Sequence, residues 1–350
     1  MSFSALFPAL PPVYVIHFVT HRCNLACEFC CDGHNRAARS ELELPDIEHF
    51  YERLVAAQLS ITGGEPTLRK DLAAILRAAL RARVHSVSLN TNGLLPSRLE
   101  SILCEALQAS ERRRLKVNIS IDGFRETHDR MRGLPGSFDA AFESCERILR
   151  LRERFPGLSL RVNTVVTTDN RHELLEFRQF VRFRLPQLAD QIFSLHRTPP
   201  GGSVDPKVLA VYREATRLAI AERGILPKQA LLKRLHTRMY EEIGELAAGK
   251  TTGFQCPAGG ALVEVTAAGE VIGCEVLPKA AASLGMLLDH EHDLASVLRG
   301  PKAAQFRERI AREHCACTFE CAHLTAATID PARAMFSNLE VKSKLARLSR

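Results

Sequence analysis

Three cysteines in one short segment are the residues of this chain with the clearest capacity for chemistry. Cys23, Cys27 and Cys30 are separated by three and two residues. Three thiolates at this spacing can hold one small iron-sulfur cluster from a single loop, and they are one fewer than the usual four ligands. The iron that lacks a protein ligand would be open to bind another molecule. The alternative is a zinc knuckle with Cys31 or His34 as its fourth ligand.

A second group of cysteines lies toward the other end of the chain. Cys256 and Cys274 come first, and the segment before Cys274 is typical of a β-hairpin that presents this residue. Cys315, Cys317 and Cys321 follow after a long gap. In a chain without a secretion signal, clustered cysteines favour metal binding over disulfide bonds.

The elements that must position the first cysteines are predicted by alternating sequence patterns. Short apolar runs alternate with segments in which apolar residues recur with a helical period. Six strands alternating with about five helices predict an α/β fold with a parallel sheet and helices outside it. Six units are fewer than the eight of a closed barrel, so we expect a partial (β/α)6 barrel that is open on one side. The predicted strands are 13–19, 58–62, 84–89, 115–121, 158–166 and 191–195, and the predicted helices are 47–55, 72–80, 99–107, 137–154 and 171–183.

Polar motifs stand at the ends of successive predicted strands. Each motif alone is typical of a turn, but in a parallel barrel these strand ends form one functional face. Glycines there allow close approach to a ligand, and carbonyl groups with a carboxylate suit an ammonium group. We therefore expect one polar ligand site that faces the first cysteine segment. The motifs are Gly63-Gly64-Glu65-Pro66, Asn90-Thr91-Asn92-Gly93, Ser120-Ile121-Asp122-Gly123 and Asn163-Thr164.

The alternation weakens after a Pro/Gly cluster at 198–202, which predicts a linker. Two polar helices are expected near 206–223 and 228–248, followed by a segment with little helical periodicity. The predicted organisation is a barrel at 1–200, a helical linker at 201–252, a small Cys-rich α+β module at 253–330 and a tail at 331–350.

Composition excludes several classes of protein. With 46% hydrophobic and 25% charged residues in 350, the chain is typical of a globular protein. No apolar run approaches the ~20 residues of a membrane span, and no secretion signal is evident, so we predict a cytoplasmic protein. The net charge of +7, the absence of Trp and the four Tyr give little support to nucleic-acid binding.

In its motifs the chain resembles the radical S-adenosylmethionine (SAM) enzymes. The resemblance rests on the C-x3-C-x2-C segment followed by Gly-Gly-Glu-Pro and covers roughly residues 13–196. It implies that Cys23, Cys27 and Cys30 hold a [4Fe-4S] cluster whose open iron binds SAM. One electron then cleaves SAM to methionine and a 5′-deoxyadenosyl radical, which removes a hydrogen atom from the substrate. The other implied contacts with SAM are Gly63, Gly64 and Glu65 at the amino group, Phe29 at the adenine, Arg132 at the carboxylate, and Asn90, Asn92, Ser120, Asp122 and Asn163 at the ribose or methionine portion.

The C-terminal cysteines resemble the SPASM and twitch extensions of such enzymes, which hold auxiliary iron-sulfur clusters. Five cysteines are too few for the two clusters of a full SPASM module, so the resemblance implies one auxiliary [4Fe-4S] cluster. Cys256 and Cys274 would be joined by Cys321 and by either Cys315 or Cys317. The spacing of the last three departs from the usual C-x2-C, and a four-cysteine zinc ribbon is the alternative.

The resemblance leaves the substrate open between two classes. One is a ribosomally made peptide that receives a crosslink or a similar modification, which we take as the first hypothesis. The other is a small polyol or aminosugar that is oxidised at carbon. A hypothesis of another kind is a non-catalytic iron-sulfur or zinc protein. The implied partners are an electron donor such as flavodoxin or ferredoxin and the substrate, and the sequence identifies no residue that moves a substrate proton.

Overall fold

The computed structural model describes residues 11–30, 40–110, 114–197, 202–222 and 227–330. Nine strands of the described chain form one sheet in the order β6-β5-β4-β3-β2-β1-β7-β8-β9. The strands are β1 (Tyr14–Phe18), β2 (Val55–Thr62), β3 (Arg83–Thr91), β4 (Leu115–Ser120), β5 (Leu158–Val166), β6 (Asp190–Leu195), β7 (Leu262–Val265), β8 (Glu270–Ile272) and β9 (Ser283–Met286).

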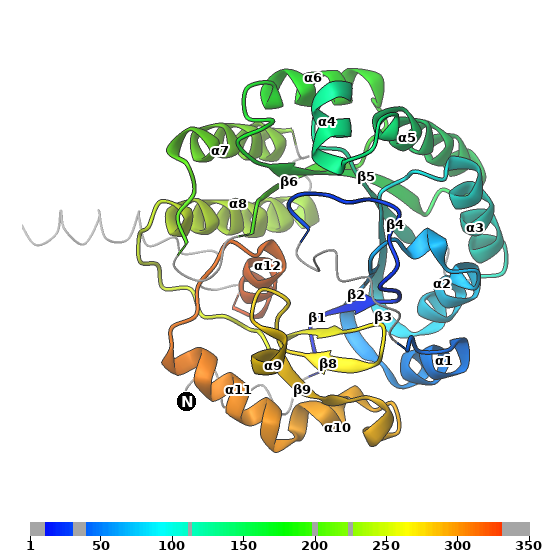
Figure 1. Cartoon of the computed structure of the whole chain (residues 1–350), viewed down its shortest axis with the longest axis vertical. Helices are drawn as coiled ribbons and strands as arrows, with labels where there is room; N and C mark the ends of the chain where they lie inside the picture. The colour runs from blue at the N-terminus through cyan, green and yellow to red at the C-terminus, as the bar shows by residue number, and fades with distance from the viewer. Residues whose placement is uncertain (1–10, 31–39, 111–113, 198–201, 223–226, 331–350) are drawn as a thin grey trace, which may run out of the picture.

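Helices cover the outside of this sheet, and Figure 1 shows them around the curved ring of strands. The sheet does not close on itself, because β6 and β9 are its two separate edges. The predicted open partial barrel is therefore confirmed. The helices are α1 (Leu44–Arg53), α2 (Leu72–Arg81), α3 (Pro96–Gln108), α4 (Arg125–Arg132), α5 (Ser137–Arg154), α6 (Leu174–Arg184), α7 (Pro206–Ala221), α8 (Pro227–Ala247), α9 (Lys279–Ala282), α10 (Leu294–Arg299), α11 (Pro301–Arg312) and α12 (Glu320–Ile329), with 3-10 turns η3 (Pro66–Leu68) and η4 (Leu288–His290).

The six predicted strands all form, and β1 to β6 pair in parallel. The boundary between α1 and β2 differs from the prediction. The helical period continues to Val55 in the sequence, but α1 ends at Arg53 because Leu54 takes an extended backbone conformation. Val55 then begins β2 as one of its exposed residues.

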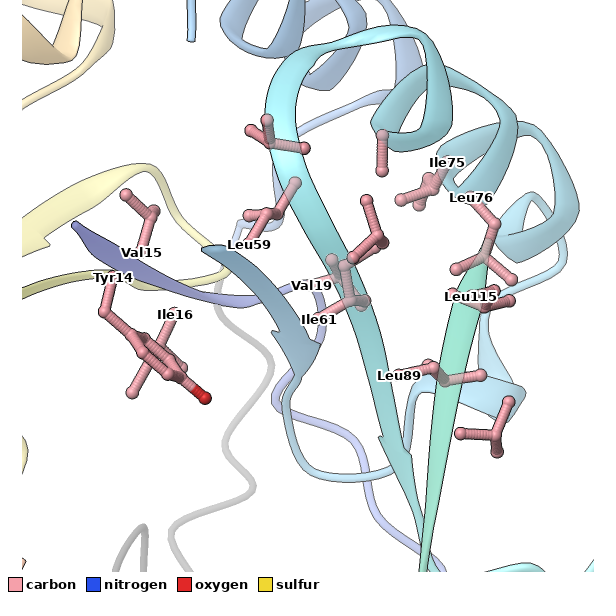
Figure 2. Close-up of a cluster of buried hydrophobic side chains, with 14 of the residues drawn as sticks. Tyr14, Val15, Ile16, Val19, Leu59, Ile61, Ile75, Leu76, Leu89 and Leu115 are labelled. Carbon is pink, nitrogen blue, oxygen red and sulfur yellow. The ribbon is translucent and has the colours of Figure 1, made fainter. Parts of the chain in front are cut away.

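The two faces of the barrel strands differ in polarity. Figure 2 shows Val15 on one side of β1, whereas Tyr14 and Ile16 lie on the other. The outward side chains of β4 and of the later parts of β2 and β3, such as Leu59, are buried beneath the helices. Each such burial contributes about 1.5–3 kcal/mol to folding. The inward face carries polar side chains at alternate positions, among them Asn118.

The C-terminal segment joins the barrel through the sheet itself. Strand β7 pairs in parallel with β1, with Leu262 opposite Tyr14. Strands β7 and β8 form the predicted hairpin, and its turn places Gly269 at φ +81°, which glycine adopts without strain. The Cys-rich segment therefore extends the barrel sheet beyond β1. The domain limits drawn from the sequence remain predictions.

Five helices were not expected from the sequence, among them the short α9 in the C-terminal segment. Helix α4 is too polar to show an apolar period, since its buried residues are Thr127, His128, Met131 and Arg132. Helices α10, α11 and α12 lie in the segment predicted to be poor in helix. Helix α11 illustrates the reason, because only Ala303, Phe306 and Ile310 of its twelve residues are buried. No described helix is long and apolar enough to cross a membrane.

Candidate active site

The segment that carries the first three cysteines follows β1 directly. Cys23 and Cys27 are half-buried and Cys30 is exposed. The backbone N–H of Cys30 donates to the carbonyl of Cys27 at 3.2 Å, which curls the segment on itself. Asn92, at the end of β3, donates from Nδ2 to Asn24 Oδ1 at 2.8 Å and ties the cysteine loop to the neighbouring strand ends. Cys31 and His34 lie outside the described residues.

Arg132, the last residue of α4, reaches the cysteine loop. Its Nη1 lies 3.7 Å from Cys27 Sγ, and its guanidinium carbon lies 5.0 Å from the centre of the Phe29 ring. On the other side its Nε donates to Asp122 Oδ2 at 2.7 Å. Asp122 is fully buried and also accepts from the backbone N–H of Val165 at 2.9 Å. The Asp122 carboxylate therefore fixes the direction in which Arg132 points.

The charge of Arg132 acts on the thiol that it contacts. Burial raises the pKa of Cys27, and the nearby Arg132 guanidinium opposes this rise. The pKa of Arg132, which burial alone would lower, is raised by Asp122 and Cys27. Because the thiolate is the form that binds a metal, a fixed cation at 3.7 Å assists ligation by Cys27.

Gly63 and Gly64 hold the cysteine loop against the end of β2. The N–H of Gly64 donates to the carbonyl of Thr20 at 2.8 Å, and the N–H of Glu65 donates to the carbonyl of Arg22 at 2.7 Å. A Cβ on Gly64 would lie 2.2 Å from the Arg22 carbonyl oxygen. The backbone of the cysteine loop thus occupies the space beside these glycines. The sequence predicts that a ligand approaches them there.

Gly64→Ala is expected to detach the cysteine loop from the end of β2. The added Cβ would overlap the Arg22 carbonyl group, and a shift of either backbone segment to relieve this overlap would cost free energy. The variant should lose most of the iron bound at Cys23, Cys27 and Cys30, as measured by iron analysis after anaerobic reconstitution. Gly136→Ala is the control, since a Cβ at Gly136 meets no atom within 4 Å and adds only the strain of a positive φ. Equal iron in both variants would contradict this role of Gly64.

The carboxylate of Glu65 accepts hydrogen bonds from residues of the protein itself. The residue is 1% exposed. Oε1 accepts from the backbone N–H and the hydroxyl of Thr67 and from the hydroxyl of Thr91, and Oε2 accepts from the backbone N–H of Asn92. Burial raises the pKa of Glu65 in spite of these bonds. The backbone carbonyls of this segment, rather than its carboxylate, are the groups left for an ammonium ligand.

The remaining predicted ligand residues lie along the inner ends of β3, β4 and β5. Asn90 donates from Nδ2 to Ser60 Oγ at 2.8 Å and accepts at Oδ1 from Asn118 Nδ2 at 2.8 Å. Ser120 and Asn163 are opposite each other in the register of β4 and β5. The buried Oδ1 of Asn163 has no hydrogen-bond partner among the described residues. This orphaned acceptor fits a ligand that donates a hydrogen bond.

Four of the five C-terminal cysteines meet at one small enclosed cavity. Cys256, Cys274, Cys315 and Cys317 line it together with apolar side chains, among them those of Leu262, Val276, Ile310 and Phe319. Cys256 and Cys315 are hydrogen-bonded to each other, a contact that, with burial, raises the pKa of Cys256. Burial raises the pKa of Cys317 to about 11. Loading these thiols with metal therefore requires the release of protons.

Cys321 does not line this cavity. Its thiol makes a hydrogen bond with Tyr14 on β1 and is influenced by the charges of Arg197, Glu320 and Glu275. Burial raises its pKa to about 12. Cys321, which the sequence predicts as a ligand, is thus not among the cysteines that line the cavity.

A partly buried group of three charged residues beside Cys274 was not predicted from the sequence. Arg197 forms an ion pair with Glu275 and lies 4.2 Å over the Phe319 ring. Glu264 is fully buried on β7 and accepts from the backbone N–H of Glu275 at 3.2 Å. Burial raises the pKa of Glu264 well above its ordinary value. A carboxylate within the apolar run of a buried strand was the signal that could have found it.

Comparison with known proteins gives consistent results. Residues 18–181 match the family model described as "Radical SAM superfamily". The AdoMet-dependent heme synthase of Methanosarcina barkeri is 28% identical over 282 residues, which are 76% of this chain and 77% of the relative. Mycofactocin maturase MftC of Mycolicibacterium smegmatis is 32% identical over 170 residues, which are 47% of this chain but only 41% of that relative.

Among solved structures, Streptococcus suis SuiB bound to precursor peptide SuiA has the same fold. The TM-score is 0.57 at 16% identity, and the match covers 90% of this chain and 71% of SuiB. At this identity the similarity concerns the fold alone. It extends beyond the barrel into the C-terminal segment.

Proposed function

Since this chain belongs to the radical SAM superfamily of enzymes, we propose that Cys23, Cys27 and Cys30 hold the [4Fe-4S] cluster at which SAM is cleaved. When bound, the cluster supplies the electron for this cleavage and the resulting radical removes a hydrogen atom from the substrate. The observation that carries the proposal is that Arg132 reaches the loop on which the three thiols lie, with its Nη1 3.7 Å from Cys27 Sγ.

In this proposal the chain's own residues orient SAM around the loop. Arg132, held by the buried Asp122, binds the SAM carboxylate by a charge-assisted hydrogen bond. The carbonyls of Gly63 and Gly64 accept from the SAM amino group. Asn163 accepts from the ribose through its orphaned Oδ1. Asn90, Asn92 and Ser120 line the same strand ends, Phe29 lies by the adenine, and Asp122 acts on SAM only through Arg132.

We further propose that Cys256, Cys274, Cys315 and Cys317 hold an auxiliary [4Fe-4S] cluster. Their common cavity supports this set over one that includes Cys321. Zinc fits less well, because a zinc site needs four ligands about 2.3 Å from one ion. Within the described chain, no three His, Cys, Asp or Glu side chains lie close enough together to bind one metal ion. A cluster is wider, since each thiolate binds a different iron.

Cys317→Ala and Cys321→Ala form a matched pair that tests this ligand set, because the two thiols are four residues apart on one segment. Cys317→Ala should lower iron from about eight to about four atoms per chain, whereas Cys321→Ala should retain about eight. Iron and sulfide analysis with electron paramagnetic resonance of the reduced proteins gives the result. Loss of iron in Cys321→Ala alone would reverse the assignment.

For the substrate we propose a ribosomally made peptide. The maturase relative supports this class. A carboxylated tetrapyrrole is a second candidate, because the match to the heme synthase spans 282 residues, whereas the match to the maturase spans 170. No comparable observation favours the polyol or aminosugar class. A flavodoxin or ferredoxin as electron donor and a cytoplasmic location stay predictions.

The two substrate classes can be separated with the reconstituted enzyme, SAM and dithionite. We would add either a precursor peptide encoded beside the gene or coproporphyrin III, and measure 5′-deoxyadenosine and the mass of the recovered substrate. The proposal expects faster nucleoside formation and a mass change with the peptide. A mass change confined to the tetrapyrrole would overturn the peptide assignment while leaving the radical SAM chemistry in place.

A further inference from the structure

The inner face of the barrel carries two cations on adjacent strands. Lys116 on β4 is opposite Ser159 of β5, and Arg161 stands two residues further along β5, opposite Asn118. Side chains two residues apart on a strand point to the same face, so Lys116 and Arg161 are diagonal neighbours there. Ser88 of β3 is opposite Lys116 on its other side.

Lys116 has no counter-ion among the residues that the structure describes. It is half-buried, and within the described chain it makes neither an ion pair nor a hydrogen bond. Burial and the charge of Arg161 lower the pKa of Lys116 to about 8. Asp190 is opposite Arg161 in the register of β5 and β6. A half-buried ammonium beside another cation is costly unless an anion joins it.

A second polar group at this place also lacks a partner. Ser88 is 2% exposed, and its buried hydroxyl has no hydrogen-bond partner among the described residues. A buried hydroxyl without a partner costs about 1–3 kcal/mol. An anion between Ser88 and Lys116 would accept hydrogen bonds from both.

We propose that Lys116, Arg161 and Ser88 bind an anionic group of the substrate, a carboxylate or a phosphate, inside the barrel. The inference rests on the proposed radical SAM function for the statement that the occupant is the substrate. Lys116 lies four residues before Ser120 on β4, which corresponds to about 13 Å along the strand. The anion is therefore held deep in the barrel, about that far from the strand ends at which SAM is bound.

The proposed anion site lies apart from the place proposed for the SAM carboxylate. The cofactor carboxylate is assigned to Arg132, which contacts the cysteine loop beyond the opposite end of β4. A substrate that reaches both places must carry its anionic group at a distance from the carbon that loses hydrogen that is comparable with this separation of about 13 Å. An acidic side chain or the C-terminal carboxylate of a peptide meets this requirement, as does a propionate of a tetrapyrrole.

The test measures acetylation of Lys116 by acetic anhydride at pH 8 in the reconstituted protein, followed by peptide mass spectrometry. About half of Lys116 is unprotonated at this pH, so it reacts well, and a bound anion favours the unreactive ammonium form. Glutarate at about 20 mM is expected to slow the reaction about fivefold at constant ionic strength. The exposed Lys302 should be unaffected, and Arg161→Gln should lose the protection.

The same measurement with different added anions identifies the kind of anion that binds. Stronger protection by inorganic phosphate than by glutarate would indicate a phosphate group, and the reverse a carboxylate. Protection by SAM alone would make the occupant the cofactor and overturn the inference, as would equal rates in all arms. Should the reagent fail to reach Lys116, the thermal midpoint decides, because glutarate should raise it in the parent protein but not in Lys116→Met. Neither the acetylation rate nor the thermal midpoint depends on SAM cleavage. A negative result for the anion site is therefore distinct from a negative result for the proposed radical SAM function.

Discussion

Replacing Cys23, Cys27 and Cys30 together by alanine is expected to abolish the formation of 5′-deoxyadenosine from SAM. Iron should fall from about eight to about four atoms per chain, since the auxiliary cluster would remain. The effect is large because the three thiols are the proposed protein ligands of one cluster and no partial set substitutes for them. Iron and sulfide analysis and chromatography of the nucleoside, on anaerobically reconstituted protein with dithionite, provide the measurement.

Cys104→Ala is the matched control for this variant, because Cys104 lies on α3, far along the chain from both cysteine groups, and should keep all the iron. About four irons in the parent protein would mean that the C-terminal cavity holds no cluster. Zinc in place of iron, without SAM cleavage, would contradict the proposed chemistry of the first site.

Arg132→Met is expected to lower the free energy of unfolding by about 3 kcal/mol. Asp122 is fully buried, and its ion pair with Arg132 is the interaction that balances its charge. Breaking a buried pair from one side leaves an uncompensated charge, which costs about 3–5 kcal/mol. Urea unfolding of the cluster-free protein measures this effect without interference from iron.

A double variant separates the charge effect from lost packing. Asp122→Asn combined with Arg132→Met removes both charges and should recover most of the lost stability. It should still bind SAM weakly in the reconstituted form, because the proposed partner of the SAM carboxylate is absent. A double variant whose loss equals the sum of the two single losses would show that the pair is not coupled.

The fold was largely predictable because its strongest signals are local. The β-branched and aromatic runs of β1 to β6 and the apolar stripes of helices such as α5 follow from hydrophobic periodicity. Helix α4 was missed since it buries His128 and Arg132 in place of apolar residues. These polar groups are stabilised by hydrogen bonds to Asp122, whose position depends on tertiary structure.

The candidate site was predictable at the level of residue types but not of contacts. Spacing marked the cysteines, yet it could not show that the Glu65 carboxylate is consumed by Thr67 and Thr91. Nor could it separate Cys317 from Cys321, because both lie on one short segment, and only the start of α12 turns one toward the cavity and the other toward Tyr14. Lys116 gave no sequence signal, since lysine on a strand is ordinarily solvated.

The pairing of β1 with β7 has a consequence for synthesis of the protein. β1 leaves the ribosome long before β7, which is one of its two neighbours and begins at Leu262. Until then β1 presents an unpaired backbone edge, which is a template for pairing with other chains. Contacts between such distant residues also slow folding. We therefore expect the nascent chain to depend on chaperones until β7 emerges, and fragments that end before β7 to aggregate.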